Sequence, residues 1–218
     1  MTLQSEIFEL PERMAALLAN QRLTVEKIAQ TVLERNIRWV FLAARGTSDN
    51  AGRYANYLWG ALNSLPLALA TPSLFTYYKQ PPQLNDALVV GISQSGQSPD
   101  IVSVLKEGQQ QGCLTLAITN QPNSPLANSA DLVLDIQAGY EKAVAATKTY
   151  TTELMAIAML SAALSDNKTH WKQLSKVPDW IEVVLKQDAP IARMAERYRY
   201  MRQCVVLGRG FNYCTAFE

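Results

Sequence analysis

Five short runs of apolar residues recur through the middle of the chain, at residues 39–44, 65–70, 87–92, 114–118 and 132–136. The runs are continuous rather than alternating, which is typical of strands buried on both faces of a sheet. Amphipathic stretches with a helical period separate them, at residues 50–63, 99–111 and 144–164. Strands that alternate with helices indicate βαβ units, so the pattern predicts an α/β fold with a parallel, doubly wound sheet of five strands.

The two flanks of this region have a different pattern. Residues 1–36 predict two peripheral helices, with Pro11 in the first turn of one helix. Thr24 is the expected N-cap of the second, which Asn36 would end. Residues 166–201 are polar and amphipathic, and they predict a helical connector broken by its prolines, Pro178 and Pro190.

A possible internal repeat links the start of the central region to the end of the chain. The eleven residues from Arg38 resemble those from Arg202 at a constant offset, which pairs Gly46 with Gly210. Each copy predicts a strand, an Arg-Gly turn and a helix. A chance likeness is the alternative, because a strand followed by glycine is common in α/β proteins. If the repeat is real, residues 37–165 form one full domain and residues 202–218 open a second one that the chain does not complete.

Composition and charge exclude several classes of function. The chain has 218 residues, 48% of them hydrophobic, which is enough for one sizeable core. Its net charge is +1 with no basic run, which argues against a nucleic-acid partner. Three cysteines without a CxxC pair indicate neither a disulfide framework nor a zinc site. No signal peptide is evident, and the longest apolar stretch is too short to span a bilayer. We therefore expect a cytoplasmic protein without a metal, a cofactor or a membrane partner.

The loop after the third apolar run carries the strongest candidate chemistry. Residues 93–98, called the serine loop below, contain three serines and one glycine. Pro99 fits the first turn of a helix, which makes Ser98 the expected N-cap. A helix N-terminus offers unpaired N–H groups and a positive dipole end, Gly96 permits close approach of a ligand, and the serines add neutral donors. A plain serine-rich cap is the alternative, but the loop has more serines than a cap needs.

Two other loops are weaker candidates. Gly46, Thr47 and Ser48 follow the first apolar run, where they offer a tight turn and two hydroxyls, or serve as an ordinary helix cap. In the loop at residues 139–148, small residues line the entry to a long predicted helix, which suits either close packing or close approach of a ligand. His170, the one histidine, lies in the connector and is interpreted as a surface or packing residue. These loops show binding groups without an obvious general base, so the catalytic residues stay unassigned.

Taken together, the three loops resemble those of the sugar isomerase (SIS) domain family. The motifs are Arg45-Gly46-Thr47-Ser48, the serine loop, and Val144-Ala145-Ala146-Thr147-Lys148, in that order. The nearest likeness is to the isomerase half of glucosamine-6-phosphate synthase and to stand-alone relatives with two SIS domains. It covers residues 36–165 and again 202–218. The resemblance implies a three-layer, flavodoxin-like fold.

The resemblance also implies a site for fructose 6-phosphate or glucosamine 6-phosphate. The phosphate would lie in the serine loop, facing Thr47, and the sugar would lie against residues 144 and 146. The family often has serine where this chain has Ala146, and usually threonine where it has Ser98. The substrate-binding residues implied in this way are Gly46, Thr47, Ser48, Ser93, Gln94, Ser95, Gly96, Ser98, Val144 and Ala146.

For the whole protein, the resemblance implies aldose–ketose isomerisation of a hexose 6-phosphate, with or without amine transfer, in a homodimer. The chain has no glutaminase domain like that of the synthase, so glutamine-dependent amination is not expected. The family's catalytic residues lie in or beyond the second domain, and this chain alone is therefore expected to bind without turnover. One alternative is a non-catalytic sugar-phosphate sensor. Another is a nucleotide-binding domain, against which the missing GxGxxG motif argues.

Overall fold

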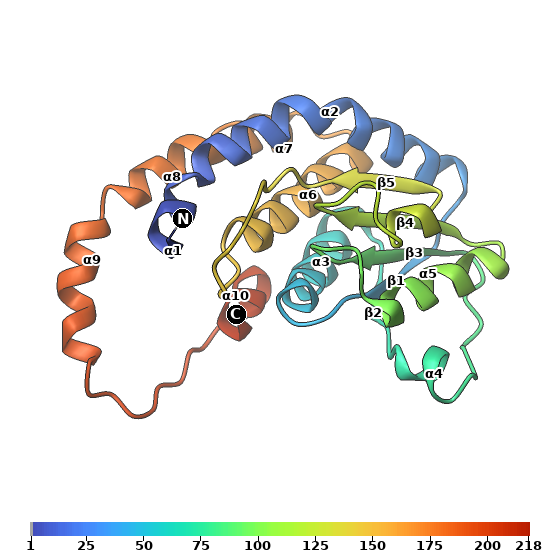
Figure 1. Cartoon of the computed structure of the whole chain (residues 1–218). Coiled ribbons are helices and arrows are strands. Elements are labelled where there is room, and N and C mark those ends of the chain that lie inside the picture. Colours follow the sequence, from blue (N-terminus) through green and yellow to red (C-terminus); the bar gives the residue numbers. More distant parts are fainter. Residues whose placement is uncertain (1) are drawn as a thin grey trace.

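A five-stranded parallel sheet lies at the centre of the computed structural model, which describes residues 2–218 (Figure 1). The strands are β1 (Trp39–Ala43), β2 (Leu67–Leu69), β3 (Ala87–Ile92), β4 (Leu114–Thr119) and β5 (Leu132–Asp135). Their order across the sheet is β2-β1-β3-β4-β5, and each neighbouring pair is parallel. Every predicted apolar run forms one strand, so the predicted parallel α/β sheet is confirmed.

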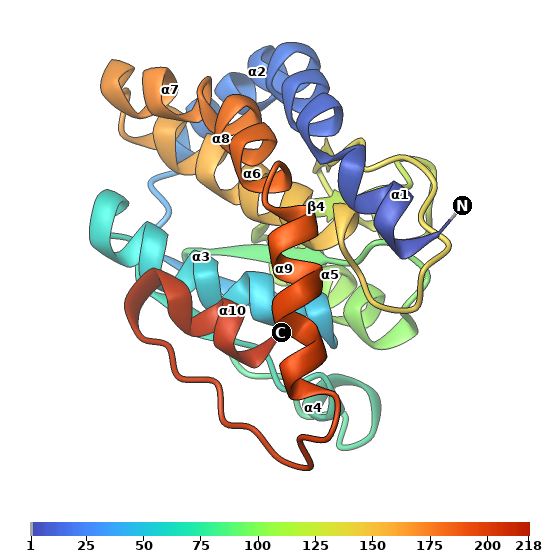
Figure 2. The ribbon, with the colours of Figure 1, turned by 90° about the vertical axis from the view of Figure 1, so that its left-hand side faces the viewer.

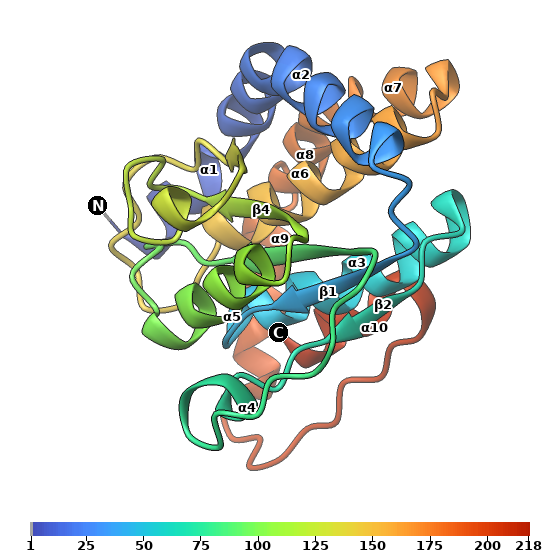
Figure 3. The ribbon, with the colours of Figure 1, turned by 90° about the vertical axis from the view of Figure 1, so that its right-hand side faces the viewer.

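Helices cover both faces of the sheet and complete the three predicted layers. They are α3 (Thr47–Asn63), α4 (Ser73–Thr76), α5 (Pro99–Gln110), the 3-10 turn η1 (Ala127–Ser129) and α6 (Lys148–Leu164). Figure 3 shows α5 on the near side of the sheet, with α3 and α6 on the far side. Side chains of β1 alternate between the two layers. Leu42 packs with Trp59 of α3 and Ile157 of α6, whereas Phe41 packs with Leu105 of α5.

The N-terminal segment forms α1 (Leu3–Phe8) and one long helix, α2 (Leu10–Glu34). The predicted start of a separate helix at Thr24 is wrong, because α2 continues through that residue. Its buried stripe keeps the helical spacing on both sides of Thr24, and burying the whole stripe outweighs the preference of threonine for a cap. The backbone of Asn36 is left-handed, with a φ of 52°, just after the helix ends. The predicted end is thus confirmed.

The segment after α6 forms three short helices, α7 (Lys168–Leu174), α8 (Val177–Leu185) and α9 (Asp188–Ala195), and a 3-10 turn, η2 (Glu196–Tyr198). Pro178 lies in the first turn of α8, in agreement with the predicted break. Trp171, Leu174 and Val177 pack against the core cluster that contains α2 and α6. The residues of α9 are all exposed, and this helix extends away from the sheet (Figure 1).

The end of the chain contains no strand between residues 201 and 209, so the strand predicted there is wrong. Val205 and Leu207 are 83% and 88% exposed. No neighbouring strand supplies the hydrogen bonds or the covered face that such a segment needs. The predicted helix does form, as η3 (Gly210–Asn212) and α10 (Tyr213–Phe217), and it packs on α3. Gly210 has a φ of 61°, close to the 56° of Gly46.

Candidate functional site

The connections on either side of β1 and β3 diverge at the centre of the sheet. From β1 the chain passes through α3 to β2 on one side, and from β3 it passes through α5 to β4 on the other. In parallel α/β sheets, such a switch point leaves a crevice beyond the carboxyl ends of the strands, and ligands bind there. The loop that contains Gly46 and the serine loop border this crevice. An ion pair between Arg45 and Asp100 joins the two sides.

The serine loop is a tight turn that has room only for glycine at position 96. The N–H of Gly96 donates to the carbonyl and the hydroxyl of Ser93, both at 3.2 Å. Gly96 has a φ of 60°, and a Cβ atom placed on it would lie 2.0 Å from Oγ of Ser124. Both the backbone conformation and the neighbouring side chain therefore require glycine here. These internal hydrogen bonds and the packing against Ser124 fix the shape of the loop.

Several donors of this loop are unpaired within the described residues. Ser98 is the N-cap of α5, as predicted, but its hydroxyl makes no capping bond. The N–H groups of Ser98 and Asp100 have no partner either. Ser95 and Gln94 are exposed. Neutral donors at the positive end of a helix dipole suit an anion, and the pairing of Asp100 with Arg45 offsets the one acidic charge in this turn.

The start of α3 differs in detail from the expected cap. Gly46, rather than a hydroxyl residue, is the N-cap of α3, so no side chain of the N-cap residue bonds to the first turn of the helix. The hydroxyl of Thr47 donates to Oε1 of Glu218 at 2.9 Å, and Nδ2 of Asn50 donates to Oε2 of the same residue at 2.9 Å. A carboxylate thus lies against the N-terminus of α3, where the helix dipole favours negative charge.

Ser48 points into the protein rather than toward the crevice. Its hydroxyl donates to Oε1 of Glu153 at 2.8 Å, and both side chains are buried. Burial, opposed by the hydrogen bond from Ser48 and helped by the nearby carboxylates of Glu141 and Glu218, raises the pKa of Glu153 to about 8. The second oxygen of Glu153 has no partner in the described chain. The sequence did not indicate this residue, because a single glutamate in the second turn of a helix carries no local sign that it is buried.

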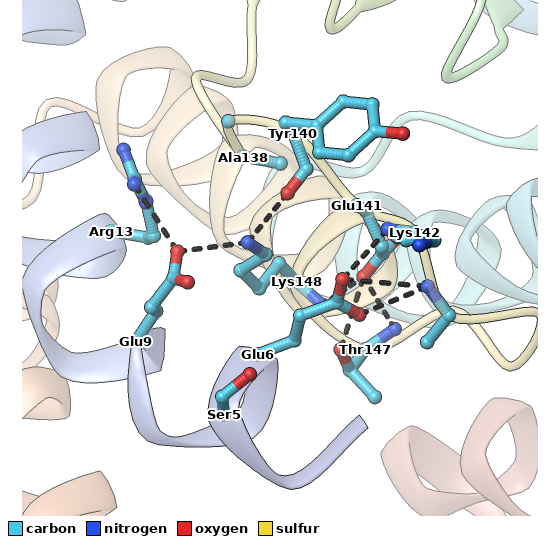
Figure 4. A network of polar contacts seen from close by, with 12 residues as sticks. Ser5, Glu6, Glu9, Arg13, Ala138, Tyr140, Glu141, Lys142, Thr147 and Lys148 are labelled. Atoms are coloured by element: carbon cyan, nitrogen blue, oxygen red, sulfur yellow. Dashed lines mark hydrogen bonds and ion pairs between the residues drawn. The ribbon is translucent and has the colours of Figure 1, made fainter. Parts of the chain in front are cut away.

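The loop at residues 139–147 leads from β5 into α6. The predicted helical start at residue 144 is wrong, because α6 begins at Lys148. The carboxylate of Glu141 accepts from the N–H groups of Thr147 and Lys148 at 2.8 and 2.7 Å, and so fixes that start. Burial raises the pKa of Glu141, but hydrogen bonds from Thr149, Thr147 and Lys148 outweigh it, and the net shift is downward. Figure 4 shows this cap beside the side chains of α1.

Asn120, in the loop after β4, connects the serine loop to the 139–147 loop. Its N–H donates to the carbonyl of Gln94 at 3.2 Å. Its side chain accepts from the N–H of Ala138 and donates to the carbonyl of Gly139, each at 2.8 Å. The loops that follow β3, β4 and β5 are therefore joined to one another at the carboxyl ends of these strands. Within this arrangement Val144 is fully exposed, whereas Ala146 is half-buried against the core.

Three other features considered from the sequence are the histidine His170, a metal site and a membrane-spanning helix. His170 is in α7, which follows the opposite end of α6 from the 139–147 loop. Across residues 2–218, no cluster of histidine, cysteine and carboxylate side chains has the composition of a metal site. In the same residues, no helix is long and apolar enough to cross a membrane.

The chain is similar in sequence to a known domain family and to known enzymes. A sequence profile of the SIS domain matches residues 35–163. The glutamine–fructose-6-phosphate aminotransferase [isomerizing] of Caldanaerobacter subterraneus subsp. tengcongensis is 31% identical over an alignment 231 residues long, gaps included, which covers 97% of this chain. The chain spans 38% of the length of that relative.

Two solved structures have the same fold over most of this chain. One is a candidate phosphosugar isomerase from Silicibacter pomeroyi, with a TM-score of 0.85 and 35% identity over 90% of this chain and 60% of that one. The other is the C-terminal domain of glucosamine-fructose-6-phosphate aminotransferase from Francisella tularensis. Its TM-score is 0.80, with 28% identity over 97% of this chain and 63% of that one.

Proposed function

Because the chain belongs to the SIS domain family, we propose that its serine loop holds the phosphate of a hexose 6-phosphate of the fructose 6-phosphate or glucosamine 6-phosphate class. The observation that carries this proposal is the set of unpaired donors in the serine loop, at the N-terminus of α5 and beside the switch point of the sheet. Family relatives whose names include fructose 6-phosphate support the choice of sugar.

The contacts follow from the positions of the loops. The hydroxyls of Ser95 and Ser98, with the free N–H groups beside them, bind the phosphate oxygens, and Ser93 and Gln94 complete this set. Thr47 contributes from the facing loop once its hydroxyl turns from Glu218. The backbone of the 139–147 loop lines the sugar, since Asn120 fixes that loop beside the serine loop. Neutral donors suffice because charge-assisted hydrogen bonds to an anion are about twice as strong as neutral ones.

The proposed activity of the whole protein is aldose–ketose isomerisation of such a sugar phosphate, with or without amine transfer. Isomerisation by an enediol or enamine route needs a base at C1 and C2 of the sugar. The serine loop supplies the anchor that positions the substrate for this base. We further propose that the whole protein acts as a homodimer in the cytoplasm. The relatives' names describe an isomerising aminotransferase and a candidate phosphosugar isomerase, and both fit this class of reaction.

Calorimetric titration tests the anchor directly. We expect binding of glucosamine 6-phosphate and fructose 6-phosphate, and no binding of unphosphorylated glucosamine or of AMP. Ser95→Ala should weaken binding by about 1 kcal/mol or more, or roughly fivefold or more, which is the usual size for a lost hydrogen bond to a charged group.

Ser175→Ala is the matched control, because Ser175 is exposed at the end of α7 and binds only a nearby helical carbonyl. It should leave the affinity unchanged. Wild-type affinity in both Ser95→Ala and Ser98→Ala would rule out the serine loop as the phosphate site.

A further inference from the structure

Helix α1 lies against the 139–147 loop, although more than 130 residues separate them in sequence (Figures 1 and 2). Glu6 is wholly buried at this contact. Its carboxylate accepts from the N–H of Lys142 at 2.7 Å and from the N–H of Ala143 at 3.2 Å (Figure 4). A buried carboxylate is stable only with such donors, so these bonds fix both the side chain and the loop.

A second charged contact fixes the two ends of the same loop. Lys148, at the start of α6, is wholly buried, and its Nζ donates to Oε2 of Glu9 and to the carbonyl of Tyr140, both at 2.8 Å. The hydrogen bond from Lys148 lowers the pKa of Glu9, and contact with Arg13 lowers it further while burial opposes them. Removing Glu9 would leave a buried ammonium group without its counter-charge, which is strongly unfavourable.

The middle of the loop has few other attachments. In the described chain, the N–H groups of Lys142 and Ala143 donate to Glu6 alone. Val144, the next residue, is fully exposed, and residues 139–147 contain no helix or strand. Asn120 holds the start of the loop and Glu141 holds its end. Between these points, the shape of the loop therefore depends on α1.

We propose that α1 acts as a clamp that keeps the 139–147 loop in the shape that meets the sugar, with Glu6 and Glu9 as its positioning residues. This inference rests on the proposed function, since it assigns the loop to the sugar of the bound hexose phosphate. The serine loop has its own internal hydrogen bonds and makes none to α1. The clamp accordingly controls recognition of the sugar and leaves the phosphate anchor intact.

Glu6→Ala separates these two effects. In the unliganded variant, we expect amide hydrogen exchange at residues 140–147 to become about tenfold faster or more, with no change in β3 and β4. The affinity for glucosamine 6-phosphate should fall by about tenfold, because a loosened loop must be ordered on binding. The affinity for inorganic phosphate, which contacts only the serine loop, should stay the same.

Two variants make the measurement decisive. Glu12→Ala removes an equal charge from the same part of the chain, where the side chain is exposed and has no hydrogen bond in the described residues, and it should change neither readout. Glu6→Gln keeps one acceptor oxygen, so its effects should be smaller than those of Glu6→Ala. It also gives the same readouts if the alanine variant does not fold.

Each contrary result has its own meaning. Unchanged exchange at residues 140–147 would overturn the clamp. Faster exchange with unchanged affinity for glucosamine 6-phosphate would overturn its positioning role, as would equal losses of sugar phosphate and inorganic phosphate. If the wild-type chain bound neither ligand, the proposed function itself would fail, while the exchange data would still decide whether α1 holds the loop.

Discussion

Gly96 shows at the scale of one residue why the serine loop has its shape. Its left-handed backbone and the side chain of Ser124 together leave no room for a Cβ atom. Gly60, in α3, offers a matched comparison, since a Cβ atom there would meet nothing within 4 Å. The same substitution therefore has opposite consequences at the two positions.

We expect Gly96→Ala to destabilise the fold by about 1 kcal/mol or more and to abolish binding of glucosamine 6-phosphate, because the loop must change shape. Gly60→Ala should stabilise the fold by up to about 1 kcal/mol, since alanine is the better helix former. Urea denaturation and calorimetric titration of the two variants provide the measurement. Normal ligand binding by Gly96→Ala would contradict the part that the loop's shape plays in the proposed site.

At the scale of elements, the contact between α3 and α6 contains a carboxyl group whose charge depends on pH. The ordinary pKa of Glu153 is 4.5, and burial raises it to about 8 in the folded chain. Between these values, the folded chain holds a proton that the unfolded chain has released. The stability of the fold therefore decreases as the pH rises from about 4.5 to about 8, and this contribution then levels off.

Glu153→Gln should remove this dependence, because the amide does not titrate and can still accept from Ser48. Relative to this variant, the wild-type free energy of unfolding should be lower at about pH 9 than at about pH 6, measured by urea denaturation. Glu12→Gln, at an exposed position, should keep the wild-type slope. Parallel profiles for the wild-type chain and Glu153→Gln would show that Glu153 is charged in the folded state throughout.

The elements that the sequence predicted well are those defined by local pattern. The five strands followed from continuous apolar runs, which in this alternating order have few other interpretations. The start of α6 was missed because residues 144–147 continue the apolar pattern of the helix. The carboxylate that caps the true start belongs to Glu141, which lies in an irregular loop and gives no local helix signal. The break at Thr24 was predicted because a threonine before apolar residues is a common local cap signal, whereas the buried stripe of α2 is a tertiary feature.

The same distinction applies to the site. The serine loop was evident because its serines, its glycine and the following proline are adjacent in sequence. Glu6 and Glu153 were not, because each is recruited by groups far along the chain, at Lys142 for Glu6 and at Ser48 for Glu153. Single carboxylates in amphipathic or apolar helices give no local signal that they are buried.

At the scale of the whole molecule, the segment from residue 201 to 209 leaves apolar side chains in water. Val205 and Leu207 are almost fully exposed, and Val206 between them is 64% exposed. Adjacent apolar side chains of this kind favour association. We expect the chain to self-associate at high concentration, and Val205→Lys combined with Leu207→Lys to reduce it in sedimentation velocity.

Leu23→Lys serves as the comparison, because Leu23 is an exposed apolar residue on α2, at 71%, away from this segment. It should have a smaller effect than the double substitution. If neither change altered the sedimentation of the wild-type chain, the exposed segment would not be the contact surface.

Both described ends of the chain lie on the side of the molecule that contains the crevice. Helix α1 contacts the 139–147 loop, and Glu218 accepts from Thr47. An affinity tag or a surface-coupling handle at either end would therefore place foreign residues beside the groups that we assign to the ligand. Gln110 is the better position for a label in any binding assay, because it is exposed at the last residue of α5, far along the chain from the serine loop and the 139–147 loop, and its side chain has no hydrogen bond in the described residues.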